Sequence, residues 1–224
     1  EVEKATKGRM QIEDVSLSPF GVTIENALLV LPSKEPGGKG SKVNAESISV
    51  SPSILQMLKG RLGFVVDAEV FGGTAEGVVG IADEEYEASL KFKGLFIDEI
   101  LKLARVDAAE VKGSASGELY INFPPEQKER TGDLKLEFEN IVVSIGELMG
   151  FEVPQINLGK ISTSATMKAN LLTLNELKSD SEDLALSLDA LGTVNYKRPK
   201  SSTYEAHIII EVKEPFWQKN PKLV

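Results

Sequence analysis

The sequence contains no cysteine, and its 224 residues include a single histidine. Without cysteine the chain can form no disulfide, no cysteine-ligated zinc site, no iron–sulfur cluster and no thiol nucleophile. One histidine cannot build a histidine-rich zinc site, and no HExxH spacing occurs. The residue types that most often carry metal and thiol chemistry are therefore scarce or missing.

Basic clusters and long apolar runs are also scarce. The formal net charge is −9, and the longest basic cluster is the stretch from Lys197 to Lys200. This composition argues against nucleic-acid binding, because phosphate contacts need clustered Lys and Arg. No apolar run approaches the roughly 18–20 residues of a membrane-spanning helix. The chain begins with Glu1 rather than Met, and we expect that an upstream signal or anchor has been removed.

Residues that could carry catalysis form no recognisable motif. His207 shares its strand parity with Glu205 and Glu211, which predicts a solvent-facing position, and no Gly-x-Ser-x-Gly elbow is present. In the glycine cluster from Gly37 to Gly40, a glycine stands where a phosphate-binding loop needs Ser or Thr. Paired carboxylates lie at predicted turns, where solvated charge is the ordinary interpretation. We therefore expect no enzyme activity, no metal and no cofactor.

The dominant pattern is the alternation of apolar and polar residues. Hydrophobic residues make up 42% of the chain but aromatic residues only 6%, so the core must consist of Leu, Ile, Val and Ala. Alternation at every second position is typical of a strand in a sheet with one dry face. About a dozen such strands are joined by short connections, which favour antiparallel neighbours. We expect a mainly β fold, with one domain over residues 1–224 built on a large curled antiparallel sheet.

Two or three short helices are predicted to pack on this sheet. Ile97, Ile100, Leu101 and Ala104 fall at helical spacing ahead of a strand that ends at Pro124. A second helix runs through Leu58 after a Ser-Pro-Ser cap, with Ile54, Leu55 and Leu58 on one face. A further helical turn is predicted at Ile145–Met149, and a shift of phase after Asn140 predicts a bulge.

The dry face of the sheet is the candidate binding surface. A sheet of this size closes, folds into two layers or curls into a trough. The aliphatic side chains then pack against each other and the helices, or they line a groove open to an apolar ligand. Packing is the commoner fate of such faces. The residues that would line an apolar trough are Leu119, Ile121, Phe123, Leu134, Leu136, Phe138, Leu184, Leu186 and Leu188.

The order of the segments resembles that of two related families. IEDVSLSPFGVTIENALLVL and KVNAESISVSPSILQMLKGRLGFVVDAEVFGGTAEG resemble the N-terminal part of AsmA-like envelope proteins. LFIDEILKLARV, GSASGELYINF, TGDLKLEFENIVV, VPQINLGKIS and SEDLALSLDALGTVNY resemble the long form of the type II secretion system protein N family. Together the fragments cover nearly the whole chain.

The resemblance implies a trough or half-barrel fold and a Gram-negative periplasmic protein, tethered to the inner membrane by an N-terminal helix absent from this sequence. It implies a non-enzymatic, accessory or structural part of type II secretion that contacts other secretion components. It also implies the alternative that the protein binds or transfers phospholipid or another acyl ligand, because AsmA-like sheets hold lipid on an apolar concave face. No catalytic residue comes with the resemblance.

Overall fold

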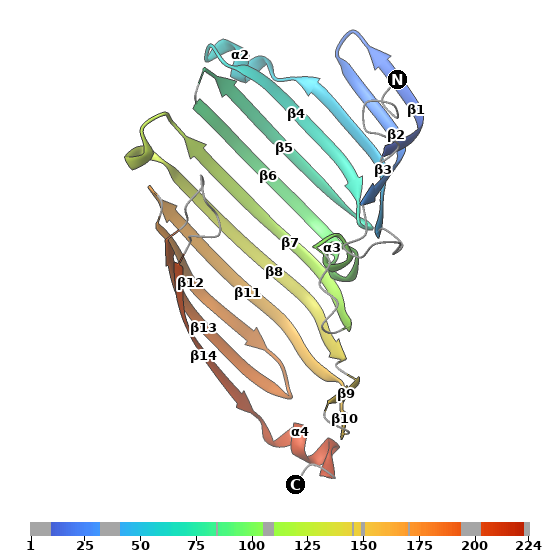
Figure 1. Cartoon of the computed structure of the whole chain (residues 1–224), viewed down its shortest axis with the longest axis vertical. Helices are drawn as coiled ribbons and strands as arrows, with labels where there is room; N and C mark the ends of the chain where they lie inside the picture. Colours follow the sequence, from blue (N-terminus) through green and yellow to red (C-terminus); the bar gives the residue numbers. More distant parts are fainter. Residues whose placement is uncertain are drawn as a thin grey trace.

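The computed structural model describes residues 10–31, 41–83, 85–104, 110–144, 146–148, 151–169, 171–193 and 203–221. Over these residues the chain forms one open antiparallel sheet of twelve strands, with a separate two-stranded hairpin and short helices (Figure 1). The strands of the large sheet lie in sequence order, as the short connections predict, with the two-stranded hairpin inserted between β8 and β11. The expected mainly β fold built on a large antiparallel sheet is confirmed.

The elements follow the alternating segments of the sequence. The strands of the large sheet, in order across it, are β1 (Met10–Ser18), β2 (Gly21–Leu31), β3 (Ser41–Pro52), β4 (Leu62–Val70), β5 (Gly73–Ala82), β6 (Glu85–Phe96), β7 (Glu110–Phe123), β8 (Thr131–Ser144), β11 (Ile156–Lys168), β12 (Leu171–Asp180), β13 (Leu184–Thr193) and β14 (Thr203–Val212). The hairpin consists of β9 (Gly146–Leu148) and β10 (Phe151–Val153). The helices are α2 (Ile54–Leu58), α3 (Ile97–Ala104), the 3₁₀ turn η1 (Gln127–Glu129) and α4 (Glu214–Lys219).

One face of the sheet is apolar from edge to edge. Its strand pairing aligns one residue from each strand in a row without a polar side chain, which we call the central apolar row. In order from β1 to β14 it consists of Leu17, Val22, Val50, Val66, Gly77, Leu90, Leu119, Leu134, Ala165, Leu174, Ala190 and Ala206. The residues one position along each strand point to the opposite face.

That opposite face is polar. Its row next to the central apolar row runs from β1 to β11 and consists of Ser16, Thr23, Ser49, Asp67, Glu76, Lys91, Glu118, Lys135 and Ser164. The register therefore separates apolar from charged residues by face, and a slip of one position in any strand would mix them.

The sheet is a single open layer. The chain exposes 15265 Å², whereas a compact protein of its mass exposes about 10,000 Å². No large side chain of the described residues is fully buried. A cluster of buried residues lies under α3, where Ile97 packs with Ala115, Ile141 and Ile161. Most of the apolar face thus has no second layer over the described part of the chain.

Helices α2 and α3 lie on opposite faces of the sheet. Helix α3 has the predicted bounds and covers one end of the apolar face (Figure 1). Helix α2 lies on the polar face, where Gln56 sits over Gly63 and Gly80. The face of α2 that carries Ile54, Leu55 and Leu58 is its exposed face, with 74%, 65% and 81% of these residues accessible.

Two predictions near the middle of the chain have different outcomes. The bulge after Asn140 is confirmed, because Asn140 has φ +55° and the β7–β8 register shifts opposite it. The helical turn at Ile145–Met149 is wrong. Gly146–Leu148 forms strand β9, which pairs with β10 instead. The basic stretch from Lys197 to Lys200 lies outside the described residues.

Candidate functional site

The nine residues predicted to line an apolar trough all belong to the apolar face. Leu119, Ile121 and Phe123 are on β7, and Leu119 pairs with Leu134 on β8. Leu136 and Phe138 follow Leu134 at two-residue steps, so they share its face. The remaining three residues, Leu184, Leu186 and Leu188, are on β13, where Ala165 and Leu174 on the intervening strands continue the same face. The register therefore brings the nine residues onto one surface.

Each of these side chains is partly shielded from solvent by its neighbours on the same face of the sheet. Leu184 is buried, with 7% accessible, and the other eight are half-buried. Phe138 packs against the cluster beneath α3, so it belongs to the covered end of the face. The half-buried state is what neighbouring strands produce on a sheet face that lacks a facing layer.

A glycine leaves space on this face for two of the larger side chains. A Cβ atom on Gly117 would lie 2.9 Å from atoms of both Phe92 and Leu136. Since this distance is too short for two carbon atoms that are not bonded, the two side chains fill the space that a larger residue at position 117 would need.

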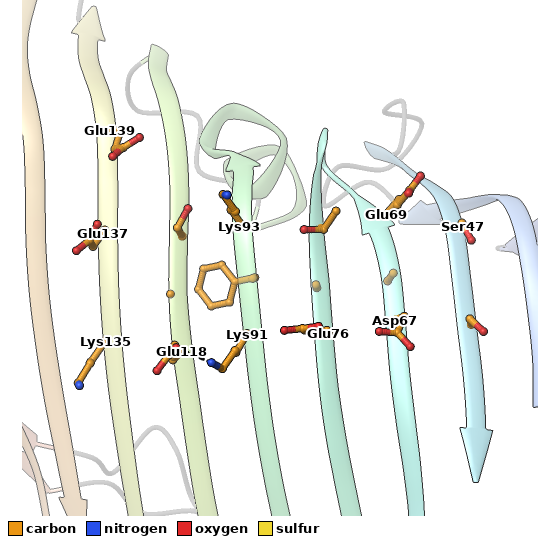
Figure 2. A pocket seen from close by; sticks show the side chains of 17 residues that line it. Ser47, Asp67, Glu69, Glu76, Lys91, Lys93, Glu118, Lys135, Glu137 and Glu139 are labelled. Atoms are coloured by element: carbon orange, nitrogen blue, oxygen red, sulfur yellow. Dashed lines mark ion pairs between the residues drawn. The ribbon is translucent and has the colours of Figure 1, made fainter. Parts of the chain in front are cut away.

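The polar face contains a hollow that the sequence did not predict. Its volume is about 940 Å³, and it lies between β3 and β8. The charged side chains around it are Asp67, Glu69, Glu76, Lys91, Lys93, Glu118, Lys135, Glu137 and Glu139 (Figure 2). They have the opposite strand parity from the nine apolar residues, so the hollow is on the other side of the sheet.

Charges of opposite sign alternate across this hollow from Glu76 on β5 to Lys135 on β8. Lys91 donates to Glu118 on the next strand at 3.0 Å, the pair joined by the dashed line in Figure 2. The hydrogen bond from Lys91 holds the pKa of Glu118 below its ordinary value and raises the pKa of Lys91. Lys160 pairs in the same way with Glu137 at 3.0 Å. Cross-strand pairing is an ordinary use of such charges.

A smaller cavity of about 390 Å³ lies beside α2 on the polar face. It is lined by Lys59, Arg61, Glu87, Tyr120 and Asn122. The Arg61 guanidinium donates to both Glu87 and Glu85. Burial, followed by the charge of Glu87, raises the pKa of Tyr120. The Oδ1 atom of Asn122 is buried without a hydrogen-bond partner among the described residues. The cavity could accept a small polar group that donates a hydrogen bond.

The remaining candidate residues are exposed or dispersed. The side chain of His207 is 76% accessible and its Nε2 is 3.8 Å from a Glu205 carboxylate oxygen, which confirms the predicted solvent-facing position. Within the described ranges no group of three or more His, Cys, Asp or Glu residues could hold a metal ion. No described helix is long and apolar enough to span a membrane.

Comparison with known proteins gives no match. Neither a family model, nor a curated protein, nor a solved structure matches this chain. Membership of the type II secretion system protein N family therefore stays a prediction from the sequence.

Proposed function

We propose that this protein is a non-enzymatic binder of acyl chains, which lie on the apolar face of its open sheet. The observation that supports the proposal is the central apolar row, which crosses all twelve strands without a polar residue. The strands are spaced about 4.8 Å apart, so the row is roughly 55 Å long. Its shape suits an elongated apolar ligand.

The physical reason is the cost of leaving this face in water. Removing apolar surface from water is favourable by about 25 cal/mol per Å². A contiguous apolar surface much larger than about 600 Å² is unusual on a soluble monomer and marks an interaction site. The described face has α3 over one end only. Acyl chains would cover the rest without needing hydrogen-bond partners, which the side chains of the central apolar row do not offer.

Binding of a fluorescent fatty acid tests the proposal. We expect wild-type protein to bind the probe in a saturable manner and unlabelled phospholipid to compete. Leu136→Asp places a carboxylate on the apolar face and should weaken binding at least tenfold, because an unpaired charge beside an acyl chain is costly. The control is Lys135→Gln, which changes the adjacent residue on the polar face and should leave binding unchanged.

The two variants also separate binding from folding. If Leu136→Asp unfolds the protein, the face is a packed core and the proposal fails. If the variant folds as the wild type does and binds the probe equally well, the acyl chain lies elsewhere and the proposal also fails. Circular dichroism and thermal melting identify the first case.

A second candidate function is an accessory role in type II secretion through protein–protein contacts. The observation that favours it is the pair of open sheet edges, since among the described residues β1 pairs only with β2 and β14 only with β13. An unpaired strand edge can accept a strand from a partner. If the protein has this accessory role, Ile209→Lys on β14 should abolish capture of a purified secretion component. Retained capture would contradict a contact through β14.

The cellular setting remains part of the same proposal. A periplasmic location with an inner-membrane anchor rests on the sequence resemblance alone. Both candidate functions are compatible with it, because lipids and secretion components meet in that compartment.

A further inference from the structure

Exposed apolar side chains lie at one end of the strands β1 to β6. They belong to the β1–β2 turn, to helix α2 and to the first residues of β4 and β6, the two strands that flank β5. We call this group the apolar tip, and it consists of Leu17, Phe20, Ile54, Leu55, Met57, Leu58, Leu62 and Tyr86. Each is between 48% and 81% accessible. Helix α2 marks this end of the sheet in Figure 1.

The orientation of α2 is set by polar contacts that turn its apolar side chains outward. Gln56 is 5% exposed and is the buried residue of the helix. Its side chain sits over Gly63 and Gly80, and its Nε2 donates to Glu87 at 3.5 Å. Ser53 caps the helix by accepting from the Gln56 amide. A surface helix normally buries its apolar side, so α2 is reversed.

The segment that follows α2 fixes the helix to the sheet. Arg61 leaves the helix end and donates to Glu85 and Glu87 on β6. The side chains of Arg61 and Glu87 are each only 18% exposed. These contacts hold α2 in place on the sheet, with its four apolar side chains directed outward.

A half-exposed lysine lies beside the outward side chains of α2. The segments 15–24 and 51–62 contain two basic residues, Lys59 and Arg61, whereas acidic residues at positions 83–85 and 87 flank Tyr86. Lys59 follows the helix directly and its side chain is 48% exposed, with its ammonium 3.8 Å from Glu87. Exposed apolar side chains with a lysine next to them are typical of segments that lie in a membrane interface.

The tip is also continuous with the apolar face. Leu62 and Tyr86 both pair with Ile81, and all three extend the apolar face to the ends of β4, β5 and β6. In this respect the inference rests on the proposed function, because an acyl-binding face needs a point of contact with the source of its ligand. Side chains presented by separate turns suit a fluid surface, which needs no complementary shape.

We propose that the apolar tip inserts into the interface of a phospholipid bilayer. Phe20 and the outward side chains of α2 enter the boundary between headgroups and acyl chains, and Lys59 remains among the phosphates. The apolar face of the sheet then meets the membrane at its α2 end.

Flotation with vesicles tests this contact. We expect wild-type protein to float with phosphatidylcholine vesicles, because the contact is apolar. Leu55→Ser should reduce the partition coefficient about tenfold, the loss expected for one large apolar side chain. The matched control is Ile209→Ser on β14, because Ile209 is 67% accessible and Leu55 65%. The control should change partition less than twofold, and neither variant should lower the melting temperature, since both side chains are exposed.

Three results would overturn the proposal: no flotation of the wild type, equal loss in the two variants, or no loss in Leu55→Ser. Loss of self-association in Leu55→Ser, seen by analytical ultracentrifugation without any flotation of the wild type, would identify the tip as a contact between copies. Fatty-acid binding measured without vesicles distinguishes the two proposals. Leu55→Ser should retain it, so a protein that floats but binds no probe would contradict the acyl-binding function alone.

Discussion

The side chain of Gln56 lies directly on the backbone of Gly63, so a Cβ atom added to Gly63 would be 2.1 Å from the Gln56 Cβ. Gly63→Ala therefore cannot be accommodated unless α2 moves away from the sheet. We expect the free energy of unfolding to fall by about 1–3 kcal/mol, as for other overpacked sites. Urea denaturation measures the change.

The control for this substitution is Gly132→Ala on β8. There the nearest atom to the added Cβ would be the terminal methyl of Met167 at 3.1 Å, and a methionine side chain adapts readily. This variant should lose less than about 1 kcal/mol. Equal losses at the two glycines would show that α2 does not need the space above Gly63.

The ion pairs of Arg61 predict a strong coupling with Glu87. Arg61→Met removes the guanidinium and leaves a carboxylate that is 18% exposed without its main partner. We expect a loss of about 1–3 kcal/mol in the free energy of unfolding. Adding Glu87→Gln should restore part of it, because the orphaned charge is then gone. A double-mutant cycle measures the coupling, and additive effects would contradict the contact.

The only tryptophan reports on the attachment of α4. Lys219 donates to the Asp183 carboxylate at 2.8 Å, and that carboxylate side chain is only 8% exposed. Phe216 is buried beside Trp217. We expect Asp183→Ala to release α4 and shift Trp217 fluorescence to longer wavelength, because the indole becomes more solvated. Glu182→Ala, which alters the weaker contact to Lys219 at 3.7 Å, is the control. An unchanged emission maximum in Asp183→Ala would contradict this attachment.

Much of the fold follows from local pattern because the sheet is built from consecutive hairpins. The period of two in β7 and the helical spacing from Ile97 to Ala104 each depend on neighbours in the sequence. The bulge at Asn140 was visible for the same reason, since an extra residue shifts the apolar phase. Within each strand the candidate residues share a face because their parity is a local property, and the pairing register then aligns the strands.

The remaining features depend on contacts that are distant in the sequence. The direction in which α2 faces is decided by Gly63 and Gly80 on two strands of the sheet, and the helix sequence alone favoured no such arrangement. Helix α4 was not predicted, although Pro215 in its first turn is a helix-start signal. The hollow on the polar face depends on how the sheet curves. That the strands form a single open sheet, and not a barrel or two layers, depends on the order in which they pair.

The environment of Tyr120 predicts a late ionisation. Burial and the nearby Glu87 carboxylate raise its pKa above the ordinary value of 10.0. The folded state therefore holds the phenol proton more tightly than the unfolded state, and the resulting stabilisation is lost as the pH rises above 10. Absorbance at 295 nm, compared between wild type and Tyr120→Phe, isolates this titration. A midpoint at or below pH 10 for the missing component would contradict the raised pKa.

Mass spectrometry of an organic extract from gently purified protein would show whether acyl ligands remain bound to the apolar face. A control protein purified in parallel accounts for carried-over membrane lipid. We expect phospholipid or fatty acid at a defined stoichiometry in the wild type, and its depletion in folded Leu136→Asp. An extract indistinguishable from the control, obtained from protein that is stable and folded, would contradict acyl binding on the apolar face.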